Sequence, residues 1–436
     1  MSVFPPQPIL IMSRIRFQLL TGVLIACTSG SLMAQSTAVD ENLLKATEAY
    51  ADYDFGAASR HLADARKALP KGERSEGIDR LERQMRDAKA FLSRIEKLQI
   101  LDSISVPEAE FFKAYRLPSA SGSIANADAL PDGIDNRDEL RQQVELVFTN
   151  EDADFKMWAQ PASMTQDPDS LDIPGSIYRM VESSRLTDGS WQSPVPLPIS
   201  LAQGGNMDFP FMKADGVTLY FASDGEGSIG GYDIFVVTRD PLTGEYLQPQ
   251  NIGMPYNSPD NDYMLAIDEI NGVGWWATDR NAAPDMVTLY LFKLNDLRSN
   301  YDADEDDDFL ISRARIEDFR STQDPDQDYT PLIEEIGNIQ PQTVKSQDFI
   351  FHLPGKRVYT SYGDFRNSSA RSLMHEYIRT LKDIQNKEVA LAELRKRFDR
   401  RPDDSLRPEI LRSEADLEAT RKQLKRLRND IYKAEL

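Results

Sequence analysis

The sequence predicts a multidomain protein of mixed α and β structure, with a short helical segment, a β-propeller core and a C-terminal antiparallel helical hairpin. Three observations lead to this prediction. A strand-rich pattern occurs twice within Asp208–Lys293, helical periodicity precedes it, and a charged segment with two apolar stripes follows it. With 436 residues the chain is too long for one hydrophobic core, so several domains are expected.

The strand-rich pattern repeats at a fixed spacing along the chain. Positions 222–224 (Ala-Ser-Asp) correspond to 277–279 (Ala-Thr-Asp), and 234–235 (Ile-Phe) correspond to 289–290 (Leu-Tyr). Both comparisons give the same step, because 277 − 222 equals 289 − 234. A repeat of this length, with several short strands and Gly/Asp turns, is typical of a β-propeller blade.

The N-terminus has the pattern of an export signal. Arg14 and Arg16 precede an apolar run that ends in small residues. Two processing sites remain open: cleavage after Ala34, which makes residues 1–34 a signal peptide, or lipidation at Cys27, where Leu-Ile-Ala-Cys resembles a bacterial lipobox. No later segment approaches the roughly 18 apolar residues of a membrane crossing, so no transmembrane segment is expected.

Charge and cysteine content exclude several classes of function. A formal net charge of −21 repels phosphate backbones, so nucleic acid is not expected as a partner. Cys27 is the only cysteine, which leaves the mature domains without a disulfide, a thiolate metal site or a cysteine nucleophile.

Residues 37–100 have the spacing of one tetratricopeptide-like helix pair followed by a third helix. The third helix carries one apolar stripe: Ile78, Leu81, Met85, Ala88, Leu92 and Ile95. Because one repeat cannot bury its own core, this segment is expected to pack against the neighbouring domain or another protein. Residues 101–143 are rich in turn formers and predict a linker that leads into the propeller.

The predicted propeller spans residues 144–366. A degenerate earlier blade covers 144–198, in which 144–152 corresponds to the strand that begins at Leu219 and 176–183 corresponds to the strand that begins at Asp233. An acidic insertion occupies 301–336, and a strand-like pair near 348–365 either belongs to a last blade or closes the ring.

These motifs resemble the WD-like repeats of TolB-type β-propellers, in secreted Gram-negative bacterial proteins that join a tetratricopeptide segment to such blades. The resemblance covers roughly residues 39–293 and is carried mainly by "DFPFMKADGVTLYFASD", "GGYDIF" and "YNSPDNDYMLAIDEINGVGWWATDR". It implies a periplasmic or outer-membrane location and a role in holding proteins together. Some relatives end in a peptidoglycan-binding domain, and no such pattern is recognisable here.

Special chemistry is not needed to explain the prominent blade residues. Asp224 and Asp279 are expected to clamp turns by accepting backbone N–H bonds from the following loop. Trp275 and Trp276 face opposite sides of one strand, so one ring fills the core and the other is a candidate exposed aromatic for a sugar or a peptide.

The acidic insertion contains a candidate calcium loop. Asp324, Asp326 and Asp328 fall at alternate ligand positions and Glu335 at the twelfth, but Tyr329 replaces the turn glycine of an EF-hand. A solvated acidic loop is the favoured interpretation, and no metal or other cofactor is expected.

Residues 367–436 predict an antiparallel helical hairpin. Two apolar stripes are separated by "DRRPDDSLRP", a Pro-containing turn between two charged helices. The stripes are expected to pack against each other, and the basic residues of this segment contrast with the acidic remainder.

No catalytic constellation is recognisable. His61, His352 and His375 are the only histidines and none has a metal-ligand spacing. The sequence therefore predicts a scaffold that is not an enzyme, periplasmic or outer-membrane-associated, with envelope proteins as partners. The alternative is a carbohydrate-binding or glycan-hydrolysing propeller, which would place two carboxylates roughly 5–10 Å apart in a channel beside an exposed tryptophan.

Overall fold

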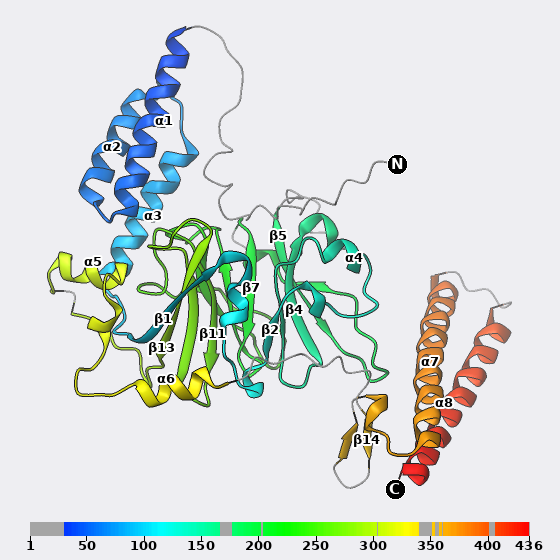
Figure 1. Ribbon diagram of the computed structural model, residues 1–436. Helices are drawn as coiled ribbons and strands as arrows, with labels where there is room; N and C mark the ends of the chain where they lie inside the picture. Colours follow the sequence, from blue (N-terminus) through cyan, green and yellow to red (C-terminus); the bar gives the residue numbers. More distant parts are fainter. Residues whose placement is uncertain are drawn as a thin grey trace, which may run out of the picture. The chain divides into compact units, whose positions relative to one another are not determined.

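The computed structural model describes residues 30–165, 177–201, 204–302, 304–339, 351–353, 357–359, 361–400 and 406–435. Cys27 and most of the predicted signal peptide lie outside these residues. The fold is mixed α and β, and the described strands form antiparallel sheets without a closed barrel (Figure 1). Among the described helices, none has the length and apolar character needed to cross a membrane.

The chain divides into two compact units. The first contains the N-terminal helices and three larger sheets, and the second contains a two-stranded sheet and two long helices. Residues 131–137 and 183–193 also belong to the second unit. Each unit is described separately below.

Three helices begin the first unit: α1 (Gly30–Ala51), α2 (Phe55–Ala68) and α3 (Glu76–Leu92). The side chains of Asp54 and Ser75 accept N–H bonds at the starts of α2 and α3, which fixes where these helices begin. Small buried residues such as Ala46 and Ala58 let α1 and α2 pack closely. The predicted stripe of the third helix is buried, except that Met85 is half-buried.

The helical segment packs against loops of the sheets, in agreement with the sequence-based expectation. The Tyr50 hydroxyl donates to the carbonyl oxygen of Ile229 at 2.5 Å, and the Gln84 amide donates to that of Gly230 at 2.7 Å. Ile229 and Met254 join the same apolar cluster as the helices. Burial of the stripe thus comes from α1 and α2 together with the sheet loops.

The first sheet has the order β2-β3-β4-β5-β6. Its strands are β2 (Ser123–Ala125), β3 (Val147–Thr149), β4 (Phe155–Pro161), β5 (Tyr178–Ser184) and β6 (Val195–Pro196). Residues 144–152 contain β3, and β4 lies between β3 and β5. It is therefore β4, and not β3, that matches the strand at Leu219, so the predicted correspondence is wrong by one strand. The turn 150–154 between β3 and β4 is short enough for a hairpin, so the apolar β4 pairs directly with β3.

The second and third sheets are the two copies of the repeat. The second contains β7 (Met207–Met212), β8 (Thr218–Ser223), β9 (Asp233–Thr238) and β10 (Gln250–Asn251). The third contains β11 (Asp262–Asp268), β12 (Val273–Thr278) and β13 (Met286–Lys293), with β1 (Gln99–Pro107) added at its edge.

Strand register confirms the fixed spacing of these two copies. Ala222 of β8 pairs with Ile234 of β9, and Ala277 of β12 pairs with Leu289 of β13. The first strand of each copy has a register shift in the same region, between Asp208 and Phe211 in β7 and between Asp262 and Leu265 in β11. The repeated sequence therefore specifies the same pairing and the same irregularity twice.

The outer strand of the third sheet comes from the part of the chain that the sequence predicts to be a linker. β1 pairs along its whole length with β13, from Gln99 opposite Lys293 to Pro107 opposite Met286. The linker prediction depended on the turn formers that follow β1. Since the partner of β1 is distant in sequence, no local pattern marks these residues as a strand.

A short segment after β1 packs beside β7 and β11, which are edge strands of the second and third sheets. It contains the 3-10 helix η2 (Glu108–Ala114), drawn in cyan in Figure 1. The Phe111 ring lies 5.8 Å from that of Phe209 in β7 and 6.1 Å from that of Tyr263 in β11. The Tyr115 hydroxyl donates to the Met264 carbonyl oxygen at 2.6 Å. Aromatic side chains thus occupy the space beside the edge strands β7 and β11, which are the innermost strands in a propeller-like arrangement of the sheets.

The acidic insertion is folded against the first unit. It forms α5 (Asp307–Arg315), the 3-10 helix η8 (Phe319–Thr322) and α6 (Thr330–Gly337). The Ile100 backbone N–H of β1 donates to the Thr322 hydroxyl at 2.9 Å. The insertion therefore covers part of the β1 edge.

The remaining short helices that the structure describes are η3 (Ser119–Ser121), η4 (Ala127–Ala129), α4 (Arg137–Leu140), η5 (Ala162–Met164), η7 (Ile199–Leu201) and η9 (Tyr362–Asp364). They connect longer elements and bury few side chains of their own.

The second unit contains β14 (Phe351–Leu353), β15 (Arg357–Tyr359), α7 (Ser368–Arg400) and α8 (Arg407–Glu435). The two helices run antiparallel, since Met374 near the start of α7 shares a core with Ile431 near the end of α8. The Lys387 ammonium pairs with the Asp416 carboxylate at 2.8 Å.

The strand pair expected to form a last blade instead belongs to this helical unit. β14 and β15 pair only with each other among the described strands. Phe351 packs in the core shared by both helices, and the Tyr359 hydroxyl donates to the Glu435 carboxylate at 2.9 Å. The sequence pattern identified the two strands correctly. They pack against α7 and α8 and not against a blade, because the apolar stripe of the helices follows them closely in sequence.

Candidate functional site

Both tryptophans of the repeat are buried, so neither is the candidate exposed aromatic. Trp276 is fully buried and Trp275 is 8% exposed. The Trp276 ring lies 4.8 Å from that of Tyr290, and the Trp275 ring lies 6.3 Å from that of Tyr115. The two rings do point to opposite sides of β12, but the segment after β1 covers the second side.

The repeat aspartates clamp backbone in both copies, although not the predicted backbone. Asp224 accepts the Asn206 backbone N–H at 2.6 Å and its amide at 2.8 Å. Asp279 accepts the same two bonds from Asn261, at 2.8 and 2.7 Å. The donors precede the first strand of each copy, whereas the prediction placed them in the following loop.

The same asparagines connect each sheet to the previous one. The Asn206 side-chain oxygen accepts the backbone N–H of Tyr178 at 2.9 Å, and that of Asn261 accepts the N–H of Tyr232 at 3.0 Å. An Asn–Asp pair therefore links neighbouring sheets twice with the same geometry. These residues are structural.

The candidate calcium loop does not assemble a metal site. Asp324 accepts the Asp326 N–H at 3.0 Å, and Asp328 accepts the Thr330 N–H at 3.0 Å. Glu335 lies in α6. Among the residues that the structure describes, no group of three or more potential metal ligands occurs. The carboxylates stabilise turns and the start of a helix.

The three histidines are dispersed. His61 lies in α2, and His375 in α7 stacks on Tyr362 with ring centroids 3.7 Å apart. His352 lies in β14, and its side chain is outside what the structure describes. No catalytic role follows from their positions.

A buried ion pair lies beside the third sheet. Asp262 and Arg280 are almost completely inaccessible to solvent and approach to 2.5 Å. Arg280 also donates to the carbonyl oxygens of Pro255, Tyr256 and Ala314. Burial raises the pKa of Asp262, which the Arg280 charge opposes. The pair joins the sheet to α5, so we interpret it as structural.

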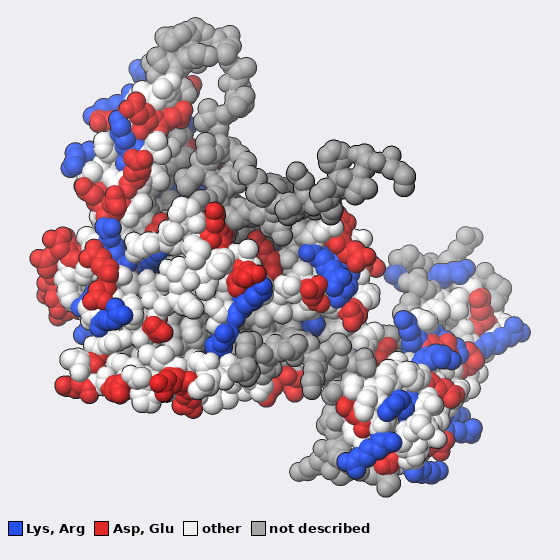
Figure 2. Space-filling view, viewed as in Figure 1, with Lys and Arg blue, Asp and Glu red and all other residues white. Residues whose placement is uncertain are grey.

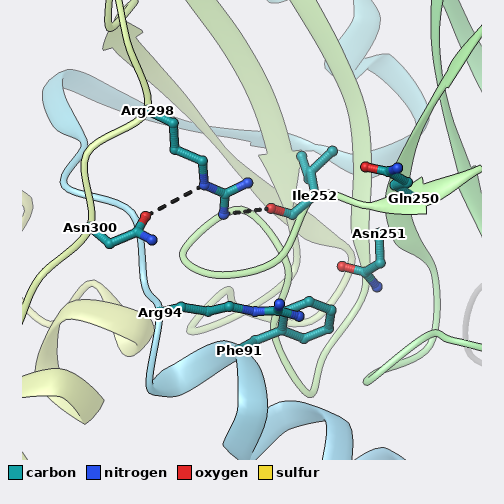
Figure 3. A pocket seen from close by; sticks show the side chains of 7 residues that line it. All are labelled: Phe91, Arg94, Gln250, Asn251, Ile252, Arg298 and Asn300. Carbon is teal, nitrogen blue, oxygen red and sulfur yellow. Dashed lines mark hydrogen bonds between the residues drawn. The ribbon is translucent and has the colours of Figure 1, made fainter. Parts of the chain in front are cut away.

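One surface pocket, of about 500 Å³, lies where α3, β10 and the segment after β13 meet (Figure 3). Phe91 lies in the last turn of α3, and Arg94 follows the end of that helix. Arg298 and Asn300 come from the segment after β13, opposite Gln250 of β10. Three distant parts of the chain thus build one pocket.

The two arginines of the pocket are held in different ways. The Arg94 guanidinium lies over the Phe91 ring, 5.0 Å from its centroid. Arg298 donates to the Ile252 carbonyl oxygen at 3.2 Å and to the Asn300 side-chain oxygen at 3.5 Å (Figure 3). Glu96 approaches Arg298 to 3.4 Å.

The floor of the pocket is fixed by backbone and amide bonds. Asn251 donates to the Asp233 carboxylate at 2.6 Å and accepts the Gly253 N–H at 2.8 Å, so its side chain has a structural role. Gly253 has a φ of +77°, and a Cβ there would lie 2.9 Å from the Phe91 ring. Only glycine permits this close approach without strain.

A second pocket, of about 290 Å³, is lined by residues that include Phe148 of β3 and Lys213. Its cations are neutralised by neighbouring carboxylates. Lys213 pairs with Glu269 at 2.8 Å, and Arg239 pairs with Glu182 at 3.6 Å. This pocket therefore offers less free positive charge than the first.

Sequence reasoning missed the first pocket entirely. Its residues form no motif, and the strands of all three larger sheets lie between Phe91 and Arg298 in the chain. An arginine directly after an amphipathic helix was the only local signal. The chain matches no protein-family model, no curated protein and no solved structure.

Proposed function

We propose that this protein is a non-catalytic scaffold of the bacterial envelope that binds other proteins through its sheet and helical surfaces. The export pattern at the N-terminus supports a periplasmic or outer-membrane-associated location, with Cys27 as the alternative lipid anchor. The resemblance to secreted proteins that join tetratricopeptide and TolB-type segments supports the same role.

The proposed architecture of the platform is propeller-like. Successive sheets pack face to face, with β4 against β7 and β11 against β8. The same Asn–Asp link recurs between them, and an early strand completes the last sheet. These are properties of propeller blades.

The observation that carries the non-catalytic assignment is the aromatic filling beside the innermost strands. A propeller enzyme needs an open channel there, whereas Phe111 and Tyr115 pack into this space. The glycan alternative also requires an exposed tryptophan, and both candidates are buried. These two facts favour a scaffold.

Charge segregation gives the scaffold two kinds of surface. Residues 367–436 contain 17 Lys and Arg against 13 Asp and Glu, a net charge of +4 in a chain whose net charge is −21. In Figure 2, red acidic atoms cover the surface around α5, and blue atoms are prominent on the helical hairpin. Surfaces of opposite sign favour partners of opposite charge.

Affinity purification of the full chain from envelope fractions, after mild cross-linking, tests this function. We expect a stoichiometric envelope protein that resists washing, and no release of reducing ends from peptidoglycan or other envelope glycans. Recovery of no such protein, or turnover of a glycan, would contradict the proposal. The mass of the mature chain decides between cleavage after Ala34 and lipidation at Cys27.

A further inference from the structure

We propose that the pocket between α3, β10 and the segment after β13 binds a single carboxylate of a partner protein, supplied by an acidic side chain or by a chain end. This inference rests on the proposed scaffold function, because it names the chemistry by which a partner is held. Four properties of the pocket lead to it.

The first property is an arginine without an acidic partner. Within the described part of the chain, no carboxylate lies within 4 Å of the Arg94 guanidinium, which is held on the Phe91 ring instead. Arg94 shares this property with exposed arginines such as Arg83, and differs from Arg83 in that it lines a pocket. Stacking leaves the N–H groups at the guanidinium edge available to an anion.

The second property is the charge balance. Arg94 and Arg298 contribute two positive charges, and Glu96, 3.4 Å from Arg298, offsets one of them. The remaining charge of about +1 matches one carboxylate rather than a doubly charged phosphate. The negative charge of the whole chain also disfavours a dianion.

The third property is that the protein itself holds both guanidinium groups in place. The bonds of Arg298 to the Ile252 carbonyl and the Asn300 side chain fix one guanidinium, and the Phe91 ring fixes the other. Preorganised guanidinium groups lose little side-chain entropy when they bind a carboxylate. An anion is therefore bound without refolding of the pocket.

The fourth property is room for more than an inorganic ion. The pocket has a volume of about 500 Å³, and Gln250 presents a side-chain amide at its rim (Figure 3). The Gln250 amide can pair with a peptide backbone next to the bound carboxylate. A carboxylate attached to a peptide thus fits the pocket better than a free ion.

Three capped pentapeptides based on glycine serve as probes in isothermal titration calorimetry with the full mature chain. One has a central glutamate and an amidated end, one a central glutamine and an amidated end, and one a free C-terminal carboxylate. We expect one or both carboxylate peptides to bind and the glutamine peptide not to bind. The stronger of the two identifies the source of the carboxylate.

Two variants test the role of the arginine. We expect Arg94→Gln to weaken binding by about tenfold or more, because a charge-assisted bond is lost. Arg83→Gln removes the same charge from an exposed position of α3 outside the pocket and should leave binding within about twofold. Thermal melting confirms that both variants are folded.

Equal binding of the glutamine peptide, unchanged affinity of Arg94→Gln, or no binding of either carboxylate peptide would overturn the assignment. These results are independent of partner capture. If a partner is recovered but the peptides do not bind, the scaffold function stands and the pocket assignment fails. If the peptides bind through Arg94 and no partner is recovered, the reverse holds.

Discussion

The two copies of the repeat have the same backbone pairing and different buried charge. Their second strands begin at Thr218 and Val273, one repeat step apart, and pair in the same register. At three matching positions the first copy has uncharged residues and the second has ionisable ones. The pairs are Gly205 and Asp260, Met207 and Asp262, and Gly225 and Arg280.

This difference shows what the repeat specifies and what it leaves to its surroundings. The shared residues determine strands, bulges and the Asn–Asp link. The charged residues of the second copy satisfy its particular neighbours, since Arg280 donates to the carbonyl oxygens of Pro255 and Ala314. The second copy thus has buried charged residues where it contacts α5, which is not part of the repeat.

Removal of the buried cation should have the largest effect. We expect Arg280→Met to lower the free energy of unfolding by about 3–5 kcal/mol, because the carboxylate of Asp262 would be left buried without its partner. Urea denaturation of the full chain measures this change in the first unit.

A double variant sharpens the same comparison. The double variant Arg280→Met with Asp262→Met removes both buried charges and places at 262 the residue that the first copy has at 207. We expect part of the lost free energy of unfolding to return. A single variant that costs less than about 1 kcal/mol would show that the pair is not a structural connection.

Loss of the turn clamps should have intermediate and nearly equal effects. Asp224→Ala and Asp279→Ala each remove two bonds to an asparagine, and we expect each to cost about 1.5–3 kcal/mol. Asp279→Ala should be slightly worse, because Tyr263 also donates to that carboxylate at 3.1 Å.

An exposed residue near the first clamp supplies the control. Glu226→Ala should change the free energy of unfolding by no more than about 0.5 kcal/mol. A large difference between the two aspartate variants would mean that the copies are not mechanically equivalent.

The smallest effect concerns Asp260 and depends on pH. Burial, followed by the charges of Asp279 and Asp262, raises the pKa of this carboxyl from 3.8 to about 6. The folded state therefore holds the proton more tightly than the unfolded state. This favourable contribution is complete below about pH 4 and is lost as the pH rises through about 6.

At pH 7.5 the ionised Asp260 therefore destabilises the fold. We expect Asp260→Asn to raise the free energy of unfolding at pH 7.5 by about 1 kcal/mol, with the gain shrinking toward pH 4. Melting temperatures from pH 4 to 8 measure it. A gain that does not depend on pH would mean that the effect is not electrostatic.

Local patterns were sufficient to predict much of the fold. The spacing of the copies, the strands around Ala222 and Ala277 and the helices at both ends follow from periodicity and turn residues. These features depend on neighbours close by in the sequence. Only half of the Asn–Asp link was predicted: the aspartates were recognised as turn clamps, and their asparagine donors were not.

Features made by distant segments could not be predicted. Trp275 is buried because Tyr115, which comes from a much earlier part of the chain, lies beside it. The strand β1 has no partner until β13, and the pocket combines Arg94 with Arg298. The local sequence does not predict these contacts, because hydrophobic packing and charge pairing depend on proximity in space and not on proximity in the chain.

The strand β1 also constrains the order of folding. Gln99 pairs with Lys293, so the first two sheets and most of the third lie between the two partners in the chain. Closing such a loop is slow, because the entropy is lost before the contacts form. During synthesis the edges of β1 therefore stay unpaired until the whole of β13 has been made. A nascent chain of this kind benefits from a chaperone that covers β1 until β13 arrives.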